Sequence, residues 1–225
     1  MEGVSDRELE EMGVQIYEDD DRLDQYYYKG KRIRTKEEFN AMRSQGIFSP
    51  EDAKTQHKTS RRLAKALLQV LPANRPVHDF GCGRGEYIRH LNQHGMRVFG
   101  YEGTKGMAET VGWNGIREVD ITQPIKVSTE GSVLCLEVLE HIEPELTDAA
   151  IANLVDACSG RLIVSWAVKG QGGHGHVNEQ DAEYVLGRFA KEGFSPNFGV
   201  SEQLRKEAGA DLWWFKKSIY VFDKK

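Results

Sequence analysis

Cysteine is scarce in this chain and is not arranged as a disulfide framework requires. The 225 residues include three cysteines, Cys82, Cys135 and Cys158, without a C-x-x-C pair. An odd number of well-separated cysteines argues against a set of disulfides. Cys82 and Cys135 lie in glycine-rich or apolar runs, where a thiol is most often a small buried hydrophobic group. We therefore assign no nucleophilic role to cysteine.

Long apolar runs and a positive net charge are also missing. No segment approaches the roughly 18–20 apolar residues of a membrane span, and the N-terminus MEGVSDRELEEMG lacks the apolar core of a signal peptide. The formal net charge is −5, whereas proteins that bind mainly duplex nucleic acid usually carry a basic field. We expect a soluble, cytoplasmic protein for which nucleic acid is a disfavoured partner. Nothing in the composition indicates an oligomeric state.

The first 56 residues differ in composition from the rest of the chain. They hold an acidic run at 18–21, a tyrosine triplet at Tyr26–Tyr28 and the basic stretch KGKRIRTK at 29–36, with weak apolar periodicity. This pattern indicates an N-terminal extension over residues 1–56 that packs on the main domain, stays partly mobile, or acts as a lid or substrate arm. As an arm, it would offer Tyr27 and its neighbours as a flat surface for a sugar or an aromatic ring. Residues 57–225 then form the main domain.

Helical and strand patterns alternate after the extension. Apolar spacing predicts helices over 59–71, 86–95, 145–158 and 180–194, and strands over 77–80, 96–102, 132–138 and 161–168. Ile219 and Val221 alternate with polar or aromatic residues as in a terminal strand. Such alternation is typical of a mostly parallel sheet with helices on both faces, so we expect an α/β, Rossmann-like fold.

A glycine-rich turn follows the strand over 77–80. It reads D79-F-G81-C-G83-R-G85, and glycine lets a backbone turn sharply and approach a ligand closely. The next strand ends at Glu102, where a carboxylate would lie beside the glycine loop and suit the two hydroxyls of a ribose. The dinucleotide pattern G-x-G-x-x-G is not met, because Glu86 occupies the place of its last glycine. A nicotinamide oxidoreductase is therefore the weaker interpretation.

These motifs together resemble those of class I S-adenosylmethionine-dependent methyltransferases. The segments VHDFGCGRGEY, FGYEGT, REVDIT and VLCLEVLEHIEP occur in the order and spacing of that family's motifs. The resemblance implies a seven-stranded sheet of strand order 3-2-1-4-5-7-6 with an antiparallel last strand. It also implies a set of residues that bind the cofactor: Asp79, Gly81, Cys82, Gly83, Gly85, Glu102, Gly103, Asp120, Ile121 and Glu137.

Methyl transfer from a sulfonium requires the acceptor atom, the methyl group and the sulfur in line. A hydroxyl acceptor also needs a base or a metal, because its pKa lies far above 7. In this fold the residues after the fourth and fifth strands face the methyl group, which places Glu137–His141 and the segment 168–180 on one rim. We assign catalytic roles to His176, His174 and Glu137, and acceptor contacts to Trp166, His141 and Tyr27. Trp166 is equally well explained as a core residue.

The segment E137-V-L-E140-H141 has two interpretations. It is common in the family and can simply shape the cofactor pocket. It also resembles the E-x-x-E-H motif of small-RNA 2′-O-methyltransferases, which add a later histidine to hold a metal that binds a vicinal diol. That resemblance implies a site for Mg²⁺ or Mn²⁺ formed by Glu137, Glu140 and His141 with His174 or His176.

The segment VKGQGGHGHVNEQ, residues 168–180, combines four glycines with two histidines. We interpret Gly170–Gly175 as a mobile gate on the acceptor side and Asn178 as the N-cap of the following helix. The preferred function is O-methylation of a hydroxyl on a glycan or other small molecule. The alternatives are a methyltransferase of RNA or protein, and a regulator that binds the cofactor without catalysis.

Overall fold

The computed structural model describes residues 14–18, 24–28, 31–33, 57–127 and 131–225. Within the predicted extension it describes three short strands, β1 (Val14–Glu18), β2 (Asp24–Tyr28) and β3 (Lys31–Ile33), which pair antiparallel in the order β1-β2-β3. Tyr27 lies on β2, and its side chain is outside the described part of the chain. The lid or arm role of residues 1–56 therefore stays a prediction.

The main domain is built on a seven-stranded sheet. Its strands are β4 (Val77–Phe80), β5 (Val98–Glu102), β6 (Ile116–Glu118), β7 (Gly131–Cys135), β8 (Cys158–Ser165), β9 (Phe194–Pro196) and β10 (Ile219–Lys224). They are arranged in the order β6-β5-β4-β7-β8-β10-β9, and β10 runs antiparallel to both of its neighbours. The predicted α/β fold, strand order and antiparallel last strand are confirmed.

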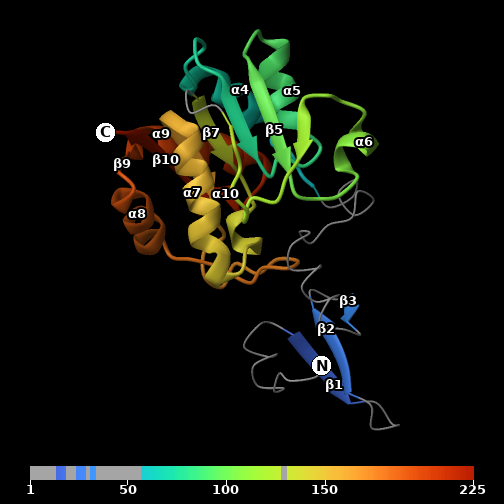
Figure 1. Cartoon of the computed structure of the whole chain (residues 1–225). Coiled ribbons are helices and arrows are strands. Elements are labelled where there is room, and N and C mark those ends of the chain that lie inside the picture. The colour runs from blue at the N-terminus through green and yellow to red at the C-terminus, as the bar shows by residue number, and fades with distance from the viewer. Residues whose placement is uncertain (1–13, 19–23, 29–30, 34–56, 128–130) are drawn as a thin grey trace.

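Helices cover both faces of this sheet (Figure 1). One face carries α4 (Arg61–Val70), α5 (Glu86–Gln93), α9 (Phe198–Asp211) and α10 (Phe215–Ser218). The other carries α7 (Thr147–Ala157) and α8 (Ala182–Lys191), and the short α6 (Met107–Val111) leads into β6. Along β10, Ile219 and Val221 pack in the core between the sheet and α4, α5, α9 and α10. Tyr220 and Phe222 pack in the core on the other face, under α7 and α8. This period of two follows from the pleat of a strand that is buried on both faces.

Helix α4 shows how the sequence sets an element. The Ser60 side chain caps its N-terminus by accepting the Leu63 backbone N–H at 3.0 Å. Its Leu63, Leu67 and Val70 side chains lie on one side and are buried against the sheet. Each buried leucine contributes about 1.5–3 kcal/mol relative to exposure, so the apolar stripe rather than intrinsic propensity holds the helix in place.

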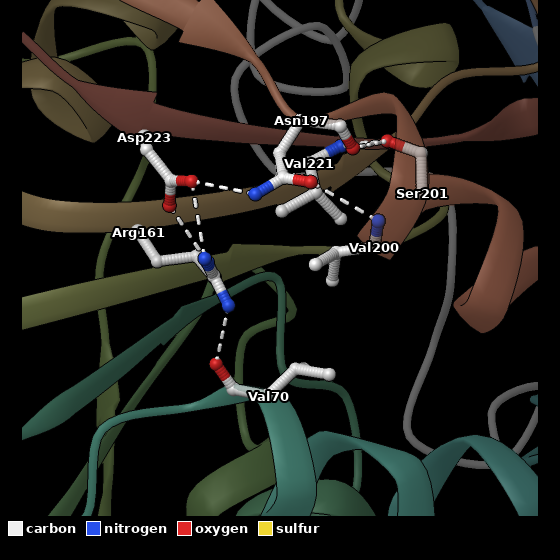
Figure 2. Close-up of polar contacts among 7 residues, drawn as sticks. All are labelled: Val70, Arg161, Asn197, Val200, Ser201, Val221 and Asp223. Atoms are coloured by element: carbon white, nitrogen blue, oxygen red, sulfur yellow. Dashed lines mark hydrogen bonds and ion pairs between the residues drawn. The ribbon is translucent and has the colours of Figure 1, made fainter.

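A polar network fixes the far end of the sheet (Figure 2). Arg161 on β8 forms a two-pronged ion pair with Asp223 on β10, with N···O distances of 2.7 and 3.0 Å, and its Nη1 donates to the Val70 carbonyl at the end of α4. Asn197 donates to Asp223 and caps α9 by accepting the Val200 N–H. The network therefore joins two strands and two helices at a distance from the site described below. Within the described ranges, no helix has both the length and the apolar content needed to cross a bilayer.

Candidate functional site

A cavity of about 380 Å³ opens at the carboxyl ends of the central strands. Strand β4 pairs with β5 on one side and with β7 on the other, so the strand order reverses at this point. Ligands of open α/β sheets bind in such crevices. The cavity is bordered by the glycine loop, by the ends of β5 and β7, and by the segment 171–176.

The glycine loop follows β4 with a backbone that requires glycine. Gly81 and Gly83 have φ angles of +75° and +55° and both line the cavity. A Cβ on Gly81 would collide with the Val138 side chain, and one on Gly83 would lie 2.6 Å from His57 Nδ1. Asp79 and Cys82 line the cavity as well, whereas Gly85 does not. Gly85 instead begins α5 as its N-cap, with φ of +71°.

Glu102 ties the second strand to this loop. It is 7% exposed, and its Oε2 accepts the Gly83 backbone N–H at 2.7 Å while its Oε1 accepts the Thr104 N–H at 2.8 Å. A carboxylate oxygen has more than one acceptor direction, so each oxygen can also receive a hydroxyl. Glu102 and Gly103 line the cavity at the position expected for ribose contacts.

The loop after β6 forms the next part of the wall, with Asp120 and Ile121. Asp120 Oδ1 accepts both the backbone N–H and the hydroxyl of Thr122, at 2.8 and 2.7 Å. Asn153 of α7 donates to the carbonyls of Ile121 and Gln123. The loop is thereby held in one conformation beside the cavity.

Carboxyl groups dominate the charge around the cavity. Burial, together with the neighbouring Glu102, raises the pKa of Asp79 to about 7. Burial also raises the pKa of Glu137 to about 7, although a hydrogen bond from Ser165 opposes the change. Burial and then Glu145 raise the pKa of Glu143 to about 7. Burial is the main cause of each shift, so a cation that entered the cavity would favour the ionised form of these acids.

Glu137 stands where β7 gives way to the short helix η1 (Leu139–His141). Among the described residues, Glu137 is the only one other than glycine that has a positive φ, +58°. Its backbone N–H donates to Ser165 Oγ at 2.6 Å, and Ser165 Oγ donates in turn to Glu137 Oε1 at 2.7 Å. This pair of contacts holds the strained backbone and directs the carboxyl group along the cavity wall.

Glu140, His141 and His176 come together, and each offers one ligand atom within 4.8 Å of the others. Glu140 is fully buried, and neither of its carboxylate oxygens has a hydrogen-bond partner among the described residues. Burial and then Glu137 raise the pKa of Glu140 well above its usual range. The rings of His141 and His176 meet edge to face with centroids 5.0 Å apart, and both line the cavity. Two imidazoles and an uncompensated carboxyl suit a divalent transition metal.

The structure narrows the predicted metal group, in which His174 and His176 were alternatives. His176 joins Glu140 and His141, while Glu137 and His174 lie outside the group that the structure brings together. His174 is exposed and lines the cavity, two residues from His176. Trp166 is fully buried, donates its indole N–H to the Asn178 carbonyl at 2.6 Å, and is not one of the described lining residues. Its role here is packing of the core, not contact with an acceptor.

Several lining residues have no signal in the sequence. His57 covers Gly83, and burial lowers the pKa of its imidazole. Tyr87 lines the cavity and accepts the Ser60 N–H through its hydroxyl. Trp213 and Trp214 complete the rim, although Trp213 is 64% exposed. Only the tryptophans, an unusual pair in a polar tail, could have suggested a binding surface.

The central part of the chain matches a known family model. Residues 78–158 match the family described as a methyltransferase domain. This range contains the glycine loop, the acid at the end of β5 and the E-V-L-E-H segment, on which the resemblance from sequence also depends. Among curated proteins, none matches the chain.

Solved structures with a similar fold are numerous. Magnesium protoporphyrin IX methyltransferase from Synechocystis PCC 6803, with bound S-adenosylmethionine, is 21% identical with a TM-score of 0.54, covering 72% of this chain and 76% of that one. The 1,6-didemethyltoxoflavin-N1-methyltransferase of Burkholderia thailandensis is 15% identical with a TM-score of 0.56, covering 94% and 99%. A sugar N-methyltransferase from Streptoalloteichus sp ATCC 53650 is 14% identical with a TM-score of 0.57, covering 76% and 90%. At these identities the likeness concerns the fold.

Proposed function

We propose that this chain, an S-adenosylmethionine-dependent methyltransferase of the class I fold, methylates a hydroxyl of a small molecule or glycan. The observation that carries the proposal is one cavity lined by the glycine loop, Glu102, His141 and His176, with the buried Glu140 grouped with the two histidines behind its wall. The glycine loop and Glu102 suit the cofactor. The group of Glu140, His141 and His176 suits activation of an acceptor oxygen, which a class I fold by itself does not require.

The cofactor half uses the residues that the resemblance implies. The loop of Gly81 and Gly83 borders the methionine end, and the surrounding carboxyl groups attract its ammonium and sulfonium charges. Glu102 accepts the ribose hydroxyls, and Asp120 with Ile121 borders the adenine. The reaction needs no covalent intermediate on the protein, because the cofactor brings its own leaving group.

The acceptor half has to solve a charge problem. Removing a proton from a hydroxyl creates an anion, and this cavity is already rich in carboxyl groups, which oppose that anion. A divalent cation at Glu140, His141 and His176 would offset the repulsion and lower the pKa of a bound oxygen. The buried Glu140 oxygens without partners fit such an ion. Two imidazole ligands favour Mn²⁺ or a later transition metal over Mg²⁺, which prefers oxygen.

The acceptor atom decides whether this chemistry is needed. A neutral amine attacks a sulfonium without prior deprotonation, so an N-methyltransferase would not depend on the Glu140 group. An O-methyltransferase with this cavity would. Dependence on a metal therefore separates the two, although both kinds of enzyme can share the fold.

The test is transfer of label from methyl-labelled S-adenosylmethionine to a panel of sugars, phenols and hydroxy acids. Activity should be lost on addition of EDTA and restored by Mn²⁺, and His176→Ala should abolish it while S-adenosylhomocysteine affinity stays within about twofold. His174→Ala, two residues away and outside the group, is the matched control. Label found only in RNA, protein or amines, or activity that ignores EDTA, would refute the proposal.

A further inference from the structure

Glu179 collects three N–H groups from the loop that carries His176. Its Oε2 accepts the Gly170 backbone N–H at 2.8 Å, and its Oε1 accepts the Gly172 backbone N–H at 2.7 Å. Oε1 also lies 2.9 Å from His176 Nδ1. Both side chains are largely buried, with 18% exposure for Glu179 and 11% for His176. One carboxylate therefore holds the segment 170–172 and the imidazole of His176 together.

This arrangement fixes which nitrogen of His176 carries the proton. A backbone N–H can only donate, so Glu179 Oε1 already acts as an acceptor toward Gly172. The same oxygen is an acceptor toward His176, and Nδ1 must then be the protonated nitrogen. In the neutral ring, Nε2 is left with its lone pair. That nitrogen is the one suited to bind a metal or to take a proton.

The remainder of the segment is anchored to the helix that carries the other two ligands. The backbone N–H groups of Val177 and Asn178 both donate to the Glu140 carbonyl, at 2.9 and 3.0 Å. His141 Nδ1 lies 3.1 Å from the Gly175 carbonyl, which can only accept. Glycines with positive φ at 170, 172 and 175 allow the turns that these contacts require. The loop is thus a folded support, with glycine serving its shape.

We propose that Glu179 is a positioning residue that holds His176 as the Nδ1–H tautomer and directs Nε2 toward Glu140 and His141. The inference rests on the proposed function for the part that concerns a metal, while the tautomer can be measured without one. Carboxylates behind a metal-bound histidine orient the ring and raise its basicity, and their loss typically weakens metal binding about 10- to 100-fold.

The experiment uses the full chain labelled with ¹⁵N and the variant Glu179→Gln, which has nearly the same shape. Long-range ¹H–¹⁵N spectra of the metal-free protein above pH 8 report the tautomer of each histidine, and His176→Asn identifies the signals of His176. Mn²⁺ affinity is measured by electron paramagnetic resonance, and S-adenosylhomocysteine affinity by calorimetry. Glu183→Gln is the matched control, because Glu183 is exposed on the first turn of α8.

In the wild type and in Glu183→Gln, His176 should be the Nδ1–H tautomer. Glu179→Gln should populate the Nε2–H tautomer and bind Mn²⁺ about 10- to 100-fold more weakly, with S-adenosylhomocysteine affinity unchanged within about twofold. A wild-type Nε2–H tautomer overturns the proposal without any variant. So does a Glu179→Gln protein that keeps either its tautomer or its Mn²⁺ affinity. Failure of wild-type protein to bind Mn²⁺ refutes the metal instead, and the tautomer measurement still decides the role of Glu179.

Discussion

The Oε2 atom of Glu102, at the end of β5, accepts the backbone N–H of Gly83 at 2.7 Å. This bond joins the acid at the expected ribose position to the loop at the expected methionine position, although 19 residues separate them in the chain. Loop conformation and ribose recognition therefore depend on the same carboxylate.

Replacing Glu102 should weaken cofactor binding substantially, because the carboxylate contacts the glycine loop and lies at the expected ribose position. Hydrogen bonds to a charged group contribute about 1.5–3 kcal/mol each, so Glu102→Ala should lower S-adenosylhomocysteine affinity by at least about tenfold in calorimetry. Glu118→Gln, at the end of the neighbouring strand β6, is the control and should bind normally because Glu118 does not line the cavity. Equal S-adenosylhomocysteine affinities in the two variants would exclude Glu102 as the residue that binds the ribose.

Substitutions at two glycines can distinguish the cost of backbone strain from the cost of a steric collision. Gly81 and Gly95 both have positive φ, +75° and +83°, but a Cβ meets the Val138 side chain at Gly81 and nothing within 4 Å at Gly95. Gly95→Ala should lower the free energy of unfolding by about 1–2 kcal/mol and leave cofactor binding intact. Gly81→Ala should destabilise the protein further in urea denaturation and also reduce cofactor affinity, because Val138 lines the same cavity. Similar losses in both variants would mean that Val138 moves aside freely.

The cofactor half of the site was largely predictable from sequence. Strand β4 has the predicted bounds of 77–80 and contains Asp79, Gly81 follows it directly, and Glu102 ends β5 as predicted. Strand β7 was predicted too long, since Glu137 leaves the extended conformation at φ +58° for reasons of local backbone geometry. Spacing along a strand does not contain that information.

The acceptor half was harder to predict. Helix α9 was missed because it has a glycine near each end and buries only small residues and Leu204, which leaves little apolar periodicity. His174 and His176 have the same composition around them, and the positive φ of Gly175 helps decide which one joins Glu140. His57 approaches Gly83 only through the tertiary fold. These contacts depend on segments that are distant in sequence.

Cofactor binding should release protons below neutral pH. Burial and Glu102 raise the pKa of Asp79 to about 7 in the folded protein, and a bound cation favours the ionised form and lowers that pKa again. Calorimetry of S-adenosylmethionine in buffers of different ionisation enthalpy should show proton release at pH 6 and much less at pH 8.5. Asp79→Asn should reduce the release at pH 6; an unchanged value would exclude Asp79 as the source.

The same shift affects stability with a defined sign. The folded state holds the Asp79 proton more tightly than the unfolded state, whose pKa is near 3.8. The contribution of Asp79 to the free energy of unfolding therefore falls as pH rises from about 4 to about 7. In the cofactor-free protein, Asp79→Asn should flatten the fall in Tm over this range. A Tm difference between the wild type and Asp79→Asn that does not change with pH would contradict the assignment.

Metal binding should be visible as thermal stabilisation. At 100 times its Kd, a ligand stabilises a protein by about 2.7 kcal/mol, which corresponds to a Tm increase of roughly 5–10 °C at this chain length. Mn²⁺ should raise the Tm of the wild type, and Glu140→Gln should abolish the increase. Glu143→Gln is the matched control, since Glu143 is also buried but lies outside the group of Glu140, His141 and His176. An increase that survives Glu140→Gln would place the ion elsewhere.

The most direct test is a crystal structure of the chain with S-adenosylhomocysteine and Mn²⁺. We predict the ribose hydroxyls on Glu102, Mn²⁺ bound by Glu140, His141 and His176, and the cofactor sulfur facing that ion across a gap that admits a single acceptor oxygen. Aligned methyl transfer needs reacting atoms within about 3–3.5 Å, so ion and sulfur must border the same space. A sulfur directed away from His176, or an ion bound by other residues, would contradict the account.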